Sequence, residues 1–286
     1  MYVGRFAPSP TGPLHFGSLV AALASYMEAR RAKGKWLLRM EDLDKPREQP
    51  GAADAILRAL DALGLRWDGA VEYQSRRGVL YRDALARLAE HTYPCGCTRS
   101  EIADSALAID GARVYGGSCR GGLPRGKTAR TIRIRAEGQI TFLDRAQGSQ
   151  AQQLERDVGD FVLWRADGQF AYQLAVVVDD AEQGVTHVVR GADLLDSTAR
   201  QIYLQQRLGY PVPRYLHVPV AVNAAGEKLS KQTGAEAVDP ARRGDALRRA
   251  FVFLGQPGTE DLAEGLRSWD AARIPASRAQ LRRASE

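Results

Sequence analysis

The apolar positions of the first forty residues predict a βαβ unit. Residues 2–6 form a short β-like run, and prolines on both sides of Ser9 exclude a helix from the following turn, because each proline disfavours the α conformation at the residue before it. Within residues 17–32 the large apolar side chains recur at helical spacing. Residues 35–40 again have the composition of a strand. This order of strand, turn, helix and strand predicts an α/β fold with a parallel sheet.

The later apolar runs predict further elements of the same kind. Amphipathic helices are expected at residues 52–65, 78–91 and 196–208. Strands are expected at residues 131–134, 161–164, 170–178 and 185–190. The most apolar run, residues 174–178, has the length of a strand, and no segment approaches the ~18 apolar residues that a membrane span needs.

A change of composition predicts an inserted module. Residues 92–130 hold all three cysteines, several glycines and few long apolar runs. We therefore expect the main domain to be divided by a small insert. Its first half is expected at residues 1–91, the insert at 92–165, its second half at 166–240 and a mostly helical C-terminal region at 241–286.

Composition and charge narrow the class of protein. The 286 residues are 44% hydrophobic and 26% charged, which is ordinary for a globular protein and excludes a disordered chain. Three cysteines, close together and odd in number, argue against a disulfide framework and for a reducing compartment. With no signal-peptide pattern at its start, the protein is expected to be cytoplasmic. A formal net charge of +6 permits an acidic partner such as RNA.

The first candidate site is the sequence His15-Phe16-Gly17-Ser18, where the first turn becomes a helix. A helix N-terminus offers unpaired N–H groups and the positive end of its dipole, so it attracts phosphate. Gly17 lets a nucleotide approach the backbone, and His15 can donate to a phosphate oxygen. The alternative is an ordinary satisfied turn.

The second candidate site is a polar segment with two lysines three positions apart, Lys228 and Lys231. Two such flexible point charges can close over a triphosphate during nucleotidyl transfer. The alternative is a solvated surface loop.

Together these segments resemble the HIGH and KMSKS motifs of class I aminoacyl-tRNA synthetases, which implies a Rossmann-like catalytic domain. They depart from the motif names at Ser18, Leu229 and Gln232. Three further stretches closely resemble the glutamyl-tRNA synthetase family, at residues 5–12, 39–44 and 189–195. The resemblance covers about residues 2–235 and implies that His15, Lys228 and Lys231 act in catalysis, and that His15, Gly17, Ser18 and Lys231 bind ATP, with Mg²⁺ expected beside it.

The chemistry of glutamate fits the same stretches. Glutamate brings one ammonium and two carboxylates, so its site needs an arginine fork and a protein carboxylate. Predicted strands end near Arg5, Glu41 and Arg190, and open α/β sheets bind ligands at those ends. The resemblance implies that Arg5 and Arg190 hold carboxylates, that Glu41 holds the ammonium and that the pocket is completed by Tyr172, Phe6, Ala7, Pro8 and Ser9. The alternatives are an ion pair of Arg190 with Asp179 or Asp193, and a helix cap at Glu41.

The cysteines predict a structural zinc site. Cys95, Cys97 and Cys119 supply three thiolates, and structural zinc takes four ligands. Spacing leaves the fourth open between His91, a common type of ligand, and Tyr115; the alternative to a metal is three buried thiols. In this motif the sequence resembles a short paralogue of glutamyl-tRNA synthetase that has a tyrosine among its zinc ligands. The resemblance implies that Tyr115 is the fourth ligand.

The chain as a whole resembles those short paralogues, the glutamyl-Q tRNA(Asp) synthetases. Only 54 residues follow Gln232, which is too little for the usual anticodon-reading domains of the longer family. The resemblance implies an enzyme, expected to be a monomer, that activates L-glutamate with ATP and transfers it to the queuosine cyclopentene diol in the anticodon wobble position of tRNA(Asp). The basic side chains of the insert could contact RNA phosphates, and the alternative is a solvated loop face; these side chains are Arg120, Arg125, Lys127, Arg130, Arg133 and Arg135.

Three alternatives compete with this function. One is a truncated glutamyl-tRNA synthetase that charges a tRNA 3′ end. Another is an inactive synthetase-like module that binds RNA or an amino acid, although it would have no need to keep the candidate residues together. The third is a different nucleotidyltransferase with the first motif but without the glutamate-pocket arginines.

Overall fold

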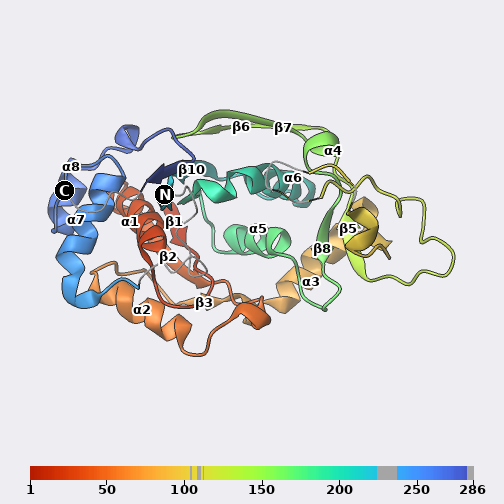
Figure 1. Cartoon of the computed structure of the whole chain (residues 1–286), viewed down its shortest axis with the longest axis horizontal. Helices are drawn as coiled ribbons and strands as arrows, with labels where there is room; N and C mark the ends of the chain where they lie inside the picture. The colour runs from red at the N-terminus through yellow and green to blue at the C-terminus, as the bar shows by residue number, and fades with distance from the viewer. Residues whose placement is uncertain (104, 108–110, 112, 224–236, 282–286) are drawn as a thin grey trace.

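The computed structural model describes residues 1–103, 105–107, 111, 113–223 and 237–281. Its core is a twisted, mainly parallel sheet covered by helices (Figure 1). Strands β1 (Val3–Phe6), β2 (Lys35–Met40) and β3 (Glu72–Tyr73) are parallel in the order β1-β2-β3. The predicted βαβ unit and the α/β class are confirmed.

A second group of strands continues this sheet beyond β1. Its order is β7-β6-β10-β9, with β9 (His187–Gly191) and β10 (Arg214–Val218) parallel and β6 (Gln139–Asp144) and β7 (Gly148–Gln153) forming an antiparallel hairpin. The amide of Thr186, just before β9, donates to the carbonyl of Val3 in β1 at 2.9 Å. The two groups of strands are therefore joined, and the ends of β1, β2 and β9 come together.

Helix α1 (Phe16–Arg31) is the central helix of the N-terminal half. It contacts β1, β2 and β9 on one side and helices α7 (Arg243–Phe253) and α8 (Leu262–Ser268) on the other. Most of its residues are buried, which explains why it carries little polar surface. Trp269 donates to Glu28 of this helix at 2.7 Å, so the C-terminal region is fixed to the helix whose N-terminus faces the candidate nucleotide site.

One predicted strand is wrong, because residues 172–182 form helix α5 (Tyr172–Glu182). The run 174–178 is at most 1% exposed at every position. A helix buried on all sides has no polar face, so its sequence cannot be distinguished by periodicity from a buried strand. The other α-helices in the described part of the chain are α2 (Ala52–Ala62), α3 (Gly78–Arg87), α4 (Leu154–Asp157) and α6 (Thr198–Leu208).

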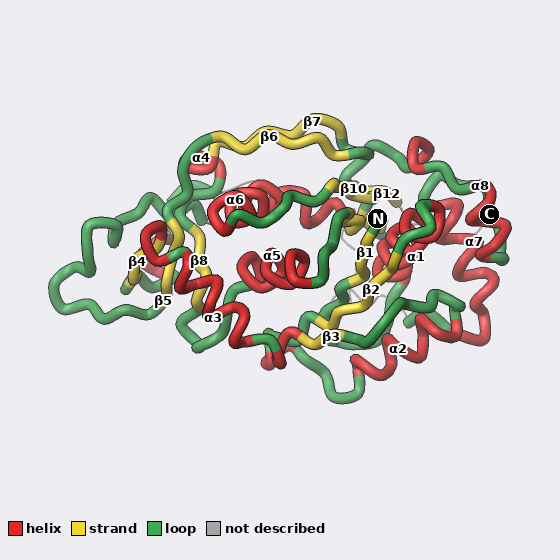
Figure 2. The backbone as a smooth tube through the Cα atoms, turned by 180° about the vertical axis from the view of Figure 1, so that it is seen from behind, coloured by secondary structure: helices red, strands yellow, loops and turns green. Residues whose placement is uncertain are grey.

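The insert is a separate small layer at one end of the molecule (Figures 1 and 2). Strands β4 (Thr92–Cys95), β5 (Thr131–Ile134) and β8 (Phe161–Trp164) form an antiparallel sheet in this order. The hairpin β6–β7 lies within the segment 92–165 that the sequence assigns to the insert, yet β6 pairs with β10 of the main sheet.

The C-terminal region is helical except at its end. After α7 and α8, strand β12 (Ala279–Leu281) pairs in parallel with β11 (Val220–Val222). None of the described helices has both the length and the apolar composition of a membrane span.

Candidate active site

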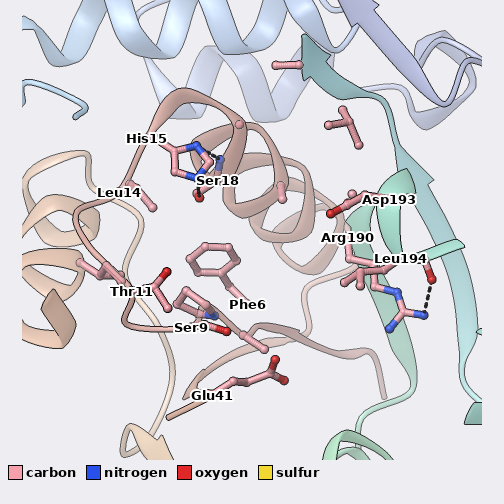
Figure 3. A pocket seen from close by; sticks show the side chains of 18 of the residues that line it. Phe6, Ser9, Thr11, Leu14, His15, Ser18, Glu41, Arg190, Asp193 and Leu194 are labelled. Atoms are coloured by element: carbon pink, nitrogen blue, oxygen red, sulfur yellow. Dashed lines mark hydrogen bonds between the residues drawn. The ribbon is translucent and has the colours of Figure 1, made fainter. Parts of the chain in front are cut away.

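A pocket of about 920 Å³ opens where β1, β2 and β9 end (Figure 3). All the predicted ligand-binding residues that the structure describes line it. They are Arg5, Phe6, Ala7, Pro8, Ser9, His15, Gly17, Ser18, Glu41, Tyr172 and Arg190. The sheet brings these residues together from positions up to 185 apart in sequence, because parallel strands present their carboxyl ends at one edge.

Arg190, on β9, is held in place by a buried relay. Its Nε donates to His217 Nε2 at 2.9 Å, and His217 Nδ1 lies 2.6 Å from Asp144 Oδ2. Because arginine has no acceptor, His217 Nε2 must accept, so the ring proton sits on Nδ1 and is donated to Asp144. Burial lowers the pKa of His217 to about 4, so the ring is neutral at neutral pH.

The relay leaves one nitrogen of Arg190 without a partner. Nη2 donates to Thr198 Oγ1 at 2.9 Å, whereas Nη1 is buried and has no hydrogen-bond partner in the described part of the chain. Asp179, one partner that the alternative named, bonds instead to Arg77, Gln74 and Tyr81. An unpaired buried donor costs about 1–3 kcal/mol, and an acidic ligand in the pocket would remove that cost.

Glu41 is the corresponding acceptor. Its backbone N–H donates to Pro8 at 2.9 Å, which fixes the end of β2 against the proline turn. Its Oε1 makes no hydrogen bond within the described chain and lies 3.5 Å from Arg39 Nη2. Burial raises the pKa of Glu41 to about 7 against the opposing effect of Arg39 and Arg5. The carboxylate therefore lacks a full counter-charge, which a ligand ammonium can provide.

Arg5 is positioned by a second buried network. Its Nε and Nη2 donate to the two oxygens of Asp180 at 3.1 and 3.3 Å. Arg39, which is fully buried, also donates to Asp180 at 2.7 Å. Burial raises the pKa of Asp180, but Arg5 and Arg39 outweigh it and hold that pKa below its usual range. Arg39 also lies 3.5 Å from Glu41 and 3.7 Å from Asp179. It is therefore shared among three carboxylates, and Asp180 holds the Arg5 guanidinium in position with both of its oxygens.

The N-terminus of α1 faces the same pocket. His15 is the N-cap residue, and its Nδ1 accepts from the Ser18 amide at 3.3 Å. Its Nε2 lies 2.9 Å from Ser18 Oγ; with Nδ1 accepting, Nε2 carries the proton. The first turn has no acidic residue, so the dipole and the imidazole together favour an anion.

The predicted Lys228 and Lys231 lie outside the described residues. The described chain resumes at Ala237, which forms a β-bridge with His15. The next residue, Val238, donates to the carbonyl of Leu14 at 2.8 Å. The chain therefore returns from this segment directly against the first motif.

The three cysteines converge in the insert. The sulfur atoms of Cys95, Cys97 and Cys119 all lie within 4.8 Å of one another. The hydroxyl of Tyr115 is 3.4 Å from the sulfurs of Cys95 and Cys97, whereas His91 is not a member of this cluster. Burial raises the pKa of Cys95, but its hydrogen bonds outweigh this and lower it to about 7. Three thiols and one phenol oxygen around one point are a donor set that fits a tetrahedral cation.

The sequence did not reveal the residues that hold the arginines. Asp180 lies in the helix that was predicted as a strand, and Arg39 stood in a recognised motif without an assigned role. His217 and Asp144 sit on β10 and β6, neither of which was predicted. The signal available in the sequence was a charged residue or histidine within or beside an apolar run. Such a residue is seldom buried unless it is paired, so its position indicates a buried partner.

Comparison with known proteins agrees with this geometry. The profile of the family described as tRNA synthetases class I (E and Q), catalytic domain, matches residues 2–258. Among curated relatives, glutamyl-Q tRNA(Asp) synthetase of Dechloromonas aromatica is 62% identical over 269 residues, covering 92% of this chain and 89% of the relative. The protein of that name from Chromobacterium violaceum is 56% identical, covering 98% of each chain.

Among solved structures, the chain is similar to a glutamate tRNA ligase from Elizabethkingia meningosepticum in complex with its amino acid. The TM-score is 0.82 at 25% identity, over 97% of this chain and 66% of that one. The shared part therefore amounts to about two thirds of the longer protein.

Proposed function

The chain belongs to the class I tRNA synthetases of the glutamate and glutamine family, and on this basis we propose that it is a ligase with two activities in sequence. It activates L-glutamate with ATP, and it transfers the glutamyl group to the cyclopentene diol of queuosine in the anticodon wobble position of tRNA(Asp). The observation that carries the first activity is a pocket that holds an unpartnered arginine nitrogen and an unpartnered carboxylate oxygen within the described chain. The names of relatives 56–62% identical support the second.

Glutamate fits this pocket by charge. Its ammonium pairs with Glu41, and its carboxylates pair with Arg190 and Arg5. Tyr172 and the turn from Phe6 to Ser9 complete the wall. Arg190 and Arg5 are both fixed by buried partners, so their guanidinium groups are preorganised and little entropy is lost when the ligand binds.

Activation joins the glutamate α-carboxylate to the α-phosphorus of ATP. The bond from that phosphorus to the pyrophosphate oxygen breaks, giving glutamyl-adenylate and pyrophosphate. His15 and the α1 N-terminus stabilise the developing phosphate charge, with Gly17 and Ser18 beside them. ATP is expected to carry Mg²⁺, whose preferred ligands are phosphate oxygens and water. The roles of Lys228 and Lys231 rest on the motif resemblance.

Transfer needs no covalent enzyme intermediate. A hydroxyl of the acceptor attacks the activated glutamyl carbon, the bond to AMP breaks, and AMP and a proton are released. The cyclopentene diol resembles the cis-diol of a ribose, so the same site can serve either acceptor. A second candidate function, glutamate transfer to a tRNA 3′ end, is favoured by the similarity to a glutamate tRNA ligase.

The insert is proposed to hold a structural zinc ion. Cys95, Cys97, Cys119 and Tyr115 would be its ligands, and a bound cation would stabilise a region with little apolar core. We expect the protein to act as a monomer in the cytoplasm.

Two measurements test the proposed function. ATP–pyrophosphate exchange over a panel of amino acids, without tRNA, should respond to glutamate; exchange driven by glutamine or aspartate instead would reject the pocket assignment. Labelled glutamate should then enter tRNA(Asp) from a strain that makes queuosine and not tRNA from a strain that lacks it. Equal labelling of both, at the 3′ end, would support the second candidate function.

A further inference from the structure

A second pocket, of about 590 Å³, lies between the insert and the helices α5 and α6. Its polar lining residues are Arg99, Arg113, Arg133, Asp160, Gln173 and Arg200. Arg99 and Arg113 are exposed, whereas Arg133 and Arg200 are 8% and 5% exposed. Three side chains make this pocket basic, Arg99 and Arg113 at its rim and Arg133 inside it, whereas Arg200 already has a partner.

The positive charge of this pocket is not cancelled by its own aspartate. Both oxygens of Asp160 are occupied by Arg120, at 2.5 and 2.7 Å, and further by the Tyr93 hydroxyl and the Ala136 amide. Among the described residues, no carboxylate forms an ion pair with Arg99, Arg113 or Arg133. Buried Arg133 Nε has no hydrogen-bond partner in this part of the chain. A multiply charged anion is the ligand that such a pocket would take.

The basic pocket adjoins the glutamate pocket through two successive residues. Tyr172 lines the glutamate pocket, and Gln173 lines the basic pocket. Consecutive Cα atoms are about 3.8 Å apart, so the two cavities share the first turn of α5. Gln173 accepts a hydrogen bond from Gln201 at 3.0 Å and donates one to Ser197 at 3.1 Å. These bonds hold the first turn of α5 in place between the two pockets.

We propose that the basic pocket binds backbone phosphates of the acceptor RNA beside the nucleoside that receives glutamate. The inference rests on the proposed function, because it assumes that an RNA hydroxyl reaches the activated glutamyl carbon. The phosphates on either side of a nucleoside lie next to it along the RNA strand. If the nucleoside occupies the glutamate pocket, these phosphates can therefore reach the basic pocket beside the first turn of α5. The α1 N-terminus belongs to the glutamate pocket, so ATP does not need these arginines. Val158 and Phe161 give the pocket an apolar part for a sugar or base.

The test is the double variant Arg99→Gln/Arg113→Gln, chosen because both side chains are exposed and should not affect folding. The matched control is Arg58→Gln/Arg267→Gln, which removes the same charge from positions on α2 and α8. These helices lie at the end of the molecule opposite the insert (Figures 1 and 2). Each enzyme is assayed for glutamate-dependent ATP–pyrophosphate exchange without tRNA, and for transfer to queuosine-containing tRNA(Asp) at several salt concentrations.

We expect the pocket variant to exchange like the wild type while its KM for tRNA rises about tenfold or more. The slope of log KM against log salt should fall by about 0.7 for each phosphate that the variant no longer binds, and the control should keep the wild-type slope. Unchanged KM and slope in the pocket variant would overturn the inference, and so would an equal loss of exchange and transfer. Absence of glutamate-dependent exchange in the wild type would instead overturn the proposed function.

Discussion

The proposed glutamate pocket and the insert with the three cysteines hold their functional groups in opposite ways. In the pocket, Arg190 and Arg5 are fixed by buried hydrogen-bonded partners inside a large apolar core. Around the three thiols of the insert, the buried apolar cluster consists of only four described residues, Tyr93, Cys95, Tyr115 and Cys119, while Ile134 and Leu163 of β5 and β8 belong to a second, larger core. A large core can support polar relays, whereas a small module depends on a metal ion or another cross-link. Perturbing the insert should therefore alter its folding, and perturbing the pocket should alter ligand affinity.

Removal of the metal should have the largest effect. Cys97→Ser should lower the zinc content of the purified protein from one per chain to near zero, since structural zinc contributes about 10–16 kcal/mol to the folding of such sites. Hydrogen exchange should then speed up in β4, β5 and β8 and stay slow in β1 and β2. His91→Ala is the control and should keep its zinc. Full zinc in the Cys97 variant, or loss of zinc in the His91 variant, would contradict the ligand assignment.

Replacement of the Arg190 guanidinium by an ammonium group should have the next largest effect, on the use of glutamate. Arg190→Lys cannot reproduce the donation to His217 and to a ligand carboxylate together, so kcat/KM for glutamate in the exchange assay should fall by about 10²–10³. Arg30→Lys removes a comparable fork that pairs with Asp68 outside the pocket, and it should leave kcat/KM within about twofold. A lysine variant as efficient as the wild type would exclude Arg190 from glutamate binding.

The relay behind Arg190 should have a smaller and more selective effect. His217→Phe keeps a ring but removes the acceptor for Arg190 Nε, so the KM for glutamate should rise by about 10- to 100-fold while the KM for ATP stays unchanged. His187→Phe is the matched control, because that ring stacks on Tyr2 outside the pocket. Equal losses for both substrates would indicate a purely structural role for His217.

The smallest effect is a pH dependence that comes from Glu41. Its pKa of about 7 means that the free protein holds this proton over the range where an unfolded chain has lost it. The free energy of unfolding of the free protein should therefore fall as pH rises from about 4.5 to 7, by up to about 3 kcal/mol.

The affinity for glutamate should change in the opposite direction. The ammonium of glutamate requires the ionised form of Glu41, so the Kd for glutamate should drop about tenfold between pH 6 and pH 8. In Glu41→Gln the affinity should be weaker and independent of pH, as calorimetry can establish.

Most of the pocket could be predicted from sequence because its residues lie in short contiguous motifs at strand ends. Arg5, His15 and Glu41 belong to a single βαβ unit, whose geometry follows from local periodicity. The supporting residues could not be predicted in this way. Asp144 and His217 meet across β6 and β10, a pairing between residues 73 positions apart, and Asp180 lies on a helix whose apolar run has no helical period. Long-range strand pairing and complete burial both remove the local signal on which sequence analysis depends.

The most direct test of the central claim is a crystal structure of the protein with bound glutamate. The account predicts that the glutamate ammonium lies within hydrogen-bonding distance of Glu41 Oε1 and that a glutamate carboxylate accepts from Arg190 Nη1, the two atoms without partners in the described chain. Glutamate bound elsewhere, or a different metabolite in this pocket with glutamate absent from it, would contradict the account.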